Sequence, residues 1–420
     1  MLKFIYIKIG VGKMKKHILA EFCAVMLLFV ANSSFAGALP DNVELSTKLN
    51  LFGSYASASE NFFPKYKEAS VKFNIDLAYH ITEDLSFNFL PYVQGSYDIN
   101  RQNRNETKTK IWQAYLNYKL SGFNFNIGRF DFADENLAPF IYYGEDLPRD
   151  LALPTSLDGL KHSFTSKYLD YTLLAAQEAQ INRYDKAKIA GAKVVAKPLT
   201  WLNISGFYFY QNKKYPRNTY RVNSKLSVYG AGIDLFFSED SGIRLYGAKN
   251  GGEEQKIRSF FTPPKPYKGY AFNSELYFQN LYETGTLKNK FGVYLFSNKD
   301  EFETASNKIQ AGIIYSGINY IDTLHVGQRI VYAVFDFNFD KYQFLYSGLG
   351  IFAYSAKKSN DNRNYNAQEI NLNVELKFDT WGFKLSGGLL EGEAVFLGGS
   401  STEKQKIKKL QANFFYKFTL

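Results

Sequence analysis

The chain contains little sulfur and little histidine. Its 420 residues include one Cys (Cys23), three Met and four His. A single thiol excludes a disulfide framework and any zinc or iron–sulfur site built on cysteines, and four histidines leave little room for a His-rich metal centre. We therefore expect no metal site, no cofactor and no catalytic residue.

Long apolar runs are also scarce. Beyond residue 40, no run of about twenty apolar residues occurs, which excludes a helical transmembrane protein. Aromatic residues are instead abundant, at 17% with 38 Phe and 32 Tyr, and the net charge is +10. Average globular domains do not show this aromatic bias, so the bias needs a structural cause.

The one apolar run lies near the N-terminus and is typical of a secretory signal. A basic segment at 13–17 precedes the apolar run 18–30, and Ser34-Phe35-Ala36 forms a small-x-small cleavage pattern. We predict a signal peptide over residues 1–36 and a mature chain over 37–420. The alternative, an anchoring or buried helix, is disfavoured because the run is too short to span a membrane. Translation could start at Met1 or at Met14, which opens a more ordinary signal.

The remaining sequence alternates with a period of two. Successive side chains of a strand point to opposite faces, so such runs predict strands with one apolar and one polar face. On the apolar face we expect Leu77, Leu116, Leu376 and Tyr416, with Trp112 on the same face as Leu116; on the polar face we expect Asn74, Asn117 and Asn373. No long stretch has a helical period. The fold class is therefore all-β.

Connections between these runs alternate in length. Short ones, such as Ser121-Gly122 and Asp340-Lys341, alternate with long polar ones, such as 212–224 and 396–405. Tight turns at one end and long loops at the other are typical of a transmembrane antiparallel up-and-down β-barrel, with the tight turns in the periplasm. We count nineteen runs, including one at 307–317, but single-chain bacterial barrels have even numbers. We therefore expect about 18 strands, with 16–20 possible, around an aqueous lumen.

The last residues support a barrel of the outer membrane. Residues 410–420 place an apolar side chain at every second position, half of them aromatic, and end at Leu420. This resembles the terminal strand through which the barrel assembly machinery of Gram-negative bacteria recognises its clients, although the usual last residue is Phe. The resemblance implies two partners, that machinery and outer-membrane lipids.

The connection 131–158 is too long to be an ordinary loop. It follows Gly128-Arg129-Phe130 and leads to Leu157-Asp158-Gly159-Leu160-Lys161. Here the sequence resembles porins of the alginate-export and carbohydrate-selective type, in which a strand closing in Gly-Arg-Gln precedes a long loop and the return strand opens with Phe-Asp-Gly-Val and a basic residue. This chain departs from that pattern at Phe130, Leu157 and Leu160. The resemblance implies a channel for small hydrophilic solutes or ions, in which loop 131–158 folds inward and narrows the lumen.

The charge of this segment fits such a constriction. Residues 131–158 carry seven acids and one Arg, a net charge of −6, whereas the rest of the mature chain carries +12. An acidic loop inside a basic wall would set up a transverse field that selects among solutes. The candidate constriction residues are Arg129, Asp131, Asp134, Glu135, Glu145, Asp146, Arg149, Asp150, Asp158 and Lys161, and the candidate lumen-wall residues are Lys72, Lys119, Lys193 and Lys197. The alternative is that these acids coat an outward loop.

Other functions find less support. A barrel-borne lipase- or protease-like enzyme, or an adhesin, would need a catalytic cluster or a large binding loop, and His162-Ser163 lacks the Asn-Gly context of the outer-membrane phospholipases. The lysines alternate with apolar residues instead of forming a patch, so we expect no nucleic-acid partner. Both a monomer and a homotrimer are compatible with the sequence.

We predict that the mature protein begins near Gly37 and fractionates with the outer membrane. N-terminal sequencing of the membrane-extracted protein checks this expectation. Retention of residues 14–30 would contradict the assignment of the signal peptide.

Overall fold

The computed structural model describes residues 40, 42–58, 66–98, 105–143, 156–179, 186–214, 222–256, 265–297, 326–357, 364–393 and 404–419. The predicted signal peptide and residues 144–155 of the long connection lie outside this part of the chain. Among the described residues, no helix is long and apolar enough to cross a membrane.

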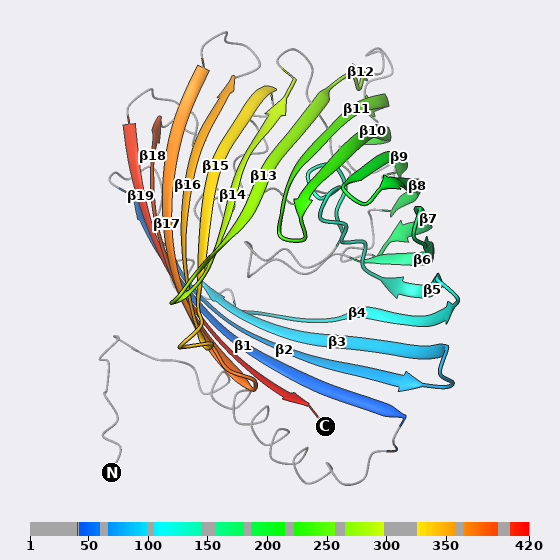
Figure 1. The fold of residues 1–420 in the computed structure, drawn as a ribbon, viewed down its shortest axis with the longest axis horizontal. Helices are drawn as coiled ribbons and strands as arrows, with labels where there is room; N and C mark the ends of the chain where they lie inside the picture. The colour runs from blue at the N-terminus through cyan, green and yellow to red at the C-terminus, as the bar shows by residue number, and fades with distance from the viewer. Residues whose placement is uncertain are drawn as a thin grey trace.

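The described residues form strands joined by turns (Figure 1). Their bounds are β1 Val43–Ala58, β2 Tyr66–His80, β3 Leu85–Asp98, β4 Asn105–Leu120, β5 Phe123–Phe130, β6 Leu157–Thr165, β7 Leu169–Glu178, β8 Lys186–Leu199, β9 Leu202–Lys214, β10 Val222–Ser238, β11 Ser241–Lys256, β12 Lys265–Pro266, β13 Tyr270–Tyr282, β14 Gly285–Phe296, β15 Val326–Phe339, β16 Leu345–Lys357, β17 Asn364–Lys377, β18 Trp381–Glu393 and β19 Lys404–Thr419. Because β12 has two residues and pairs only with β11, just ahead of β13, the barrel wall has 18 strands. The predicted strand number is confirmed.

Every long strand pairs in antiparallel fashion with its neighbours in sequence, and β1 pairs with β19 to close the ring. This pairing joins the first strand of the wall to the last, and such closure is a condition for a sheet inside a membrane. Strands β14 and β15 pair directly with each other. The expected strand at 307–317 therefore has no place in the wall between them, and these residues lie outside the described part of the chain.

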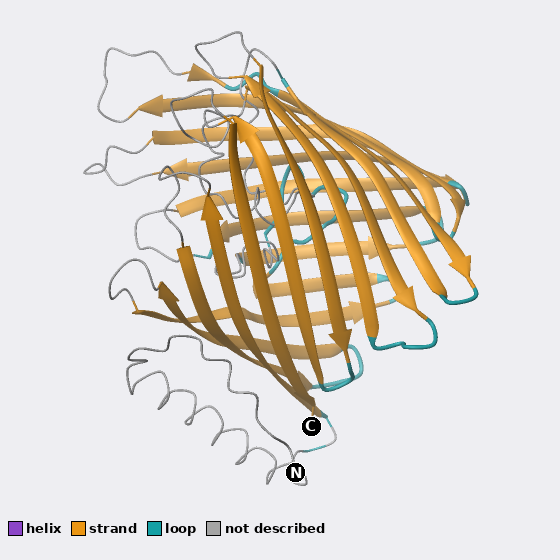
Figure 2. Ribbon diagram, turned by 90° about the vertical axis from the view of Figure 1, so that its left-hand side faces the viewer, coloured by secondary structure: helices purple, strands orange, loops and turns teal. Residues whose placement is uncertain are grey.

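Short turns gather at one end of the barrel (Figure 2). The two-residue β4–β5 turn has φ values of +44° at Ser121 and +86° at Gly122. Positive φ at both central residues is the geometry of two-residue hairpin turns, and Gly adopts it without strain. Both ends of the wall, the start of β1 and the end of β19, lie at this short-turn end.

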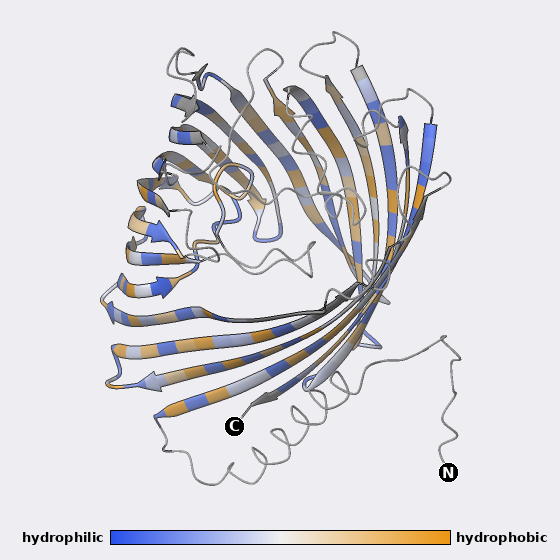
Figure 3. Ribbon diagram, turned by 180° about the vertical axis from the view of Figure 1, so that it is seen from behind, coloured by the Kyte–Doolittle hydropathy of each residue, from blue (hydrophilic) through white to orange (hydrophobic). Residues whose placement is uncertain are grey.

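Hydrophilic and hydrophobic residues alternate along the strands (Figure 3), and the two faces of the wall differ in polarity. Apolar side chains on the outward face are exposed, for example Leu116 at 42%, Leu372 at 61% and Val331 at 54%. Polar side chains of the opposite parity, such as Lys72 and Asn74, are buried inside the ring. This outward apolar band against an inward polar face defines a transmembrane β-barrel.

The strand β4 corrects one expectation. Trp112 lies inside the barrel and is buried, whereas Leu116 of the same strand points outward. The pairing with β3 skips Trp112, because Leu90 faces Gln113 and Pro91 faces Ile111. Proline has no N–H for the ladder, and the resulting bulge shifts the alternation of β4 by one residue.

We predict that Leu116→Arg destabilises the barrel by about 2–4 kcal/mol, because it places a charge on the lipid face near the bilayer midplane. Its neighbour Asn117 has the inward parity, so Asn117→Arg should cost less than about 1 kcal/mol. Urea titration of the barrel refolded into lipid vesicles measures both values. Equal losses would mean that the assigned faces are wrong.

Candidate functional site

After β5 the chain turns into the ring and follows its inner wall (Figure 1). We call residues 131–143 the inner loop. Its apolar side chains are almost completely shielded: Leu137, Ile141 and Tyr143 are 0% exposed and Phe140 is 1% exposed. A loop on the outer surface would leave such residues in water. The described part of the loop is therefore a packed element of the barrel interior.

The wall beneath the inner loop is apolar. Phe132 packs on Phe209 with ring centroids 5.4 Å apart, and Phe140 stacks on Phe207 at 5.7 Å. The same cluster continues over Leu226 and onto the neighbouring strands. Each fully buried apolar side chain contributes about 1.5–3 kcal/mol. Five such side chains, Phe132, Leu137, Phe140, Ile141 and Tyr143, hold the loop more strongly than any single polar contact.

Polar contacts fix the register of the loop. The Asp134 carboxylate is 2.5 Å from Lys193 Nζ of β8, and it also accepts hydrogen bonds from the backbone N–H groups of Asn136 and Leu137. The Gln211 side-chain amide donates to Tyr143 Oη at 3.1 Å. Burial raises the pKa of Tyr143 well above its usual value, so this phenol stays neutral.

The start of the inner loop lies next to Lys161 of β6. Lys161 Nζ is 3.4 Å from the carbonyl oxygen of Asp131 and 5.4 Å from the centroid of the Phe130 ring. Burial raises the pKa of the Asp131 carboxyl group, and the nearby Lys161 charge opposes that rise. Lys161 and Asp131 thus face each other at the base of the inner loop.

Two of the constriction candidates lie on the outward face of the wall. Arg129 and Asp158 share parity with Ile127 and Leu160, which are 58% and 42% exposed on the outward face. The two residues pair with each other, with Arg129 Nε 2.6 Å from Asp158 Oδ1. Their assignment to the constriction is therefore corrected, since strand alternation turns both side chains away from the lumen.

The remaining constriction candidates divide by position. Asp134 is neutralised by Lys193, whereas Glu135 of the inner loop is exposed. Glu145, Asp146, Arg149 and Asp150 lie outside the described residues. Of the constriction candidates, the structure thus places Asp131, Asp134 and Glu135 in the inner loop and Lys161 at its base.

The four wall lysines have the inward parity but different settings. Lys193 binds the inner loop, and Lys72 Nζ lies 5.7 Å from the centroid of the Tyr92 ring. Lys197 pairs with Asp170 at 2.7 Å, close to the short-turn end. Lys119 is exposed at the same end, beside the β4–β5 turn.

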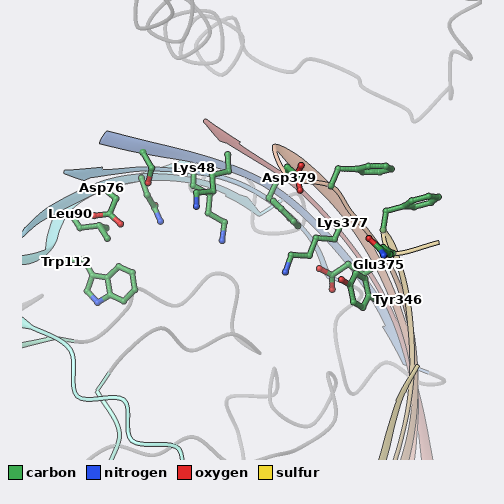
Figure 4. A pocket seen from close by; sticks show the side chains of 15 residues that line it. Lys48, Asp76, Leu90, Trp112, Tyr346, Glu375, Lys377 and Asp379 are labelled. Atoms are coloured by element: carbon green, nitrogen blue, oxygen red, sulfur yellow. The ribbon is translucent and has the colours of Figure 1, made fainter. Parts of the chain in front are cut away.

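A cavity of about 1210 Å³ opens inside the wall at the short-turn end. Figure 4 shows Lys48, Asp76, Trp112, Glu375 and Lys377 along its wall. Lysines and carboxylates are mixed here, and Lys48 is the direct cross-strand neighbour of Lys417. A wall of this composition holds water and charged groups of either sign, so the interior is hydrophilic below the inner loop.

The apolar seat of the inner loop was not expected from the sequence, although a signal is present. Phe207-Tyr208-Phe209-Tyr210 gives β9 two aromatic faces, with Tyr208 exposed at 51% and Phe209 only 2% exposed. A barrel strand without a polar face indicates that something apolar covers its inner side. Trp112 was missed for a different reason, the bulge opposite Pro91.

The chain was compared with known proteins. No family model and no curated protein matches it. Solved structures from Pseudomonas aeruginosa do match its fold. OccK5 (OpdH) has a TM-score of 0.60 at 10% identity, covering 90% of this chain and 99% of that one. OpdQ has a TM-score of 0.60 at 13% identity, covering 91% and 100%.

A third match is decisive for the class of barrel. The outer membrane protein OprD has a TM-score of 0.56 at 11% identity, covering 90% of this chain and 94% of that one. The chain has the fold of an outer-membrane β-barrel. The match covers 94% of OprD, so the likeness in fold extends over nearly the whole of that chain.

We predict that Asp134→Asn loosens the inner loop, because it removes the ion pair to Lys193 but keeps an oxygen that accepts the turn's N–H groups. A spin label at Ala133→Cys, in a Cys23→Ser background, should show a narrower, more mobile spectrum. Glu135→Gln is the matched control, since this neighbouring acid is exposed. Identical spectra in the labelled parent protein, in Asp134→Asn and in Glu135→Gln would mean that apolar packing alone fixes the loop.

Proposed function

We propose that this protein is an outer-membrane porin that gives small hydrophilic solutes or ions passive or substrate-selective passage through its lumen. The observation that carries the proposal is the inner loop, which lies inside a closed 18-stranded ring and is fixed to the wall of β8 and β9. A barrel with a packed core would need no such loop, whereas a channel needs an element that narrows it.

The interior supports this proposal. Beneath the loop, the cavity at the short-turn end is lined by charged and polar side chains such as Lys48, Asp76 and Lys377. Such a lining stabilises water and hydrated solutes in the passage. Glu135, the exposed acid of the described loop, and Lys161 at its base are our candidates for the groups that select among solutes.

For the substrate, we propose the carbohydrate class. Its support is the likeness of 128–161 to porins of the alginate-export and carbohydrate-selective type, in which the Gly-Arg and Asp-Gly pairs flank the loop. In this chain Gly128 faces Gly159 and Arg129 faces Asp158 across β5 and β6. Swelling of proteoliposomes in neutral sugars and in uronates of equal size tests this class, and equal exclusion of both would contradict it.

A barrel-borne enzyme or an adhesin is the alternative. Within the described ranges, no group of three or more His, Cys, Asp or Glu is placed to hold a metal ion. His162 lies among aromatic rings on the outward face: it stacks on Phe125 with ring centroids 4.0 Å apart and contacts Tyr171 edge-on at 5.3 Å. No observation on the described residues favours either alternative over a channel.

We expect the purified protein to form ion channels in planar bilayers and deletion of residues 133–152 to raise the single-channel conductance, because the deletion removes most of the element that occupies the lumen. Heat-modifiable migration on gels serves as the control for an intact barrel. A folded variant with unchanged conductance would mean that the constriction lies elsewhere.

A further inference from the structure

The inner loop leaves the wall between β5 and β6, and the wall there is incomplete. Strand β5 has eight residues, and its pairing with the 16-residue strand β4 reaches only to Ala114, opposite Arg129. The rest of β4 extends past the end of β5. Among the described residues, the exit of the loop therefore leaves a breach in the hydrogen-bonded ring between β4 and β6.

Arg129 bridges this breach. Its Nε and Nη2 donate to the two carboxylate oxygens of Asp158 on β6, at 2.6 and 2.8 Å. Its Nη1 donates to the carbonyl oxygen of Ile111 on β4, at 3.2 Å. One guanidinium thus joins three strands. It belongs to β5, it pairs with the Asp158 carboxylate of β6 in the bidentate geometry that only arginine provides, and it donates to the backbone of β4.

The same pair stands at the two wall ends of the connection 131–156, which begins with the inner loop; we call these ends the feet of the loop. Arg129 directly precedes Phe130, and Asp158 directly follows Leu157; both apolar residues are 0% exposed and lie opposite each other in register. Outside the wall the ion pair joins β5 to β6, and inside it Phe130 and Leu157 belong to the cluster that holds the loop. Contacts on the outer and the inner face of the wall thus fix the distance between the two feet.

The backbone beside the ion pair requires glycine at two positions. Gly128, next to Arg129, has φ = +125°, and a Cβ there would lie 2.4 Å from the carbonyl oxygen of Ala114. The opposite residue is Gly159, where a Cβ would meet the carbonyl oxygen of Ala175 at 2.3 Å. These two glycines allow the four neighbouring strands β4, β5, β6 and β7 to approach one another closely. Arg129 can therefore reach both Asp158 and Ile111.

We infer that Arg129 and Asp158 are positioning residues of the channel: from the lipid-facing side of the wall they hold the feet of the inner loop and so keep the constriction at one aperture. This inference rests on the proposed porin function. It assigns no contact with solute to either residue, because both side chains point away from the lumen. Loss of one partner leaves the other charge in a lipid-facing site, so the loop feet should separate.

Single-channel recordings of Arg129→Gln, Asp158→Asn and the exchanged pair Arg129→Asp with Asp158→Arg test the inference. The single variants should lose the one steady conductance level and fluctuate among several. The exchanged pair restores the ion pair across the same two positions and should return to one level. The matched control is Lys406→Gln, which breaks another outward cross-strand pair, Lys406–Glu391 at 3.3 Å, on β18 and β19 away from the loop.

A second readout separates this inference from the proposed function. A spin label at Ala133→Cys reports the mobility of the inner loop whether or not the protein conducts. We expect the label to become mobile in Arg129→Gln and Asp158→Asn, and to be immobile again in the exchanged pair. If Arg129→Gln does not fold, Arg129→Lys takes its place, since it keeps the charge but not the bidentate contact.

The outcomes are distinct. Absence of conductance in the wild-type protein, with the label responding as expected, would refute the porin and leave the positioning role standing. A steady channel and an immobile label in both single variants would overturn the inference. An exchanged pair as disturbed as the single variants would also overturn it, because the effect would then not come from the ion pair.

Discussion

The structure depends on the need to satisfy every backbone N–H and C=O group inside a membrane without water. A sheet meets this need only when it closes, and the pairing of β1 with β19 closes this one. Closure fixes which side of each strand meets lipid, and the alternation of apolar and polar residues along most strands follows from it. A one-residue slip in any pairing would expose a polar face to lipid.

The inner loop violates this constraint locally and requires compensation. Where it leaves the wall, β5 ends early and part of β4 lacks that neighbour. Arg129 supplies donors at this point from the outside, and the apolar cluster around Phe209 holds the loop from the inside. The basic residue of the Gly-Arg motif, which the sequence suggested as a pore group, thus has a structural role in the wall.

Much of the fold was predictable because alternation is a local property. The short turns and the outward Leu116 follow from period two and from the turn residues, whereas the number 18 needed the rule that single-chain barrels have even strand numbers; the structure confirms all three. The site was harder to predict. The outward position of Arg129 follows from its parity, but the motif at a loop base suggested the lumen, and only the register shows that Asp158 lies opposite.

Other features depend on contacts between residues distant in sequence. The pairing of Asp134 with Lys193 joins positions 59 residues apart, which no spacing rule connects. The bulge at Trp112 arises on a strand that contains no proline, because the cause lies in Pro91 of the neighbouring strand. The segment 307–317 alternates like a strand, yet β14 and β15 leave it no place in the ring. Period two indicates strand character but not membership of the barrel.

The central claim is that the inner loop stands in the path of the solute. The most direct measurement is the current through a single Ala133→Cys channel, in a Cys23→Ser background, while a bulky charged methanethiosulfonate reagent is added to the bath. If the loop lines the passage, each modification lowers the current in one discrete step, whereas the same reagent on lipid-facing Leu116→Cys has no effect. A fully modified Ala133→Cys channel with an unchanged current would contradict the account.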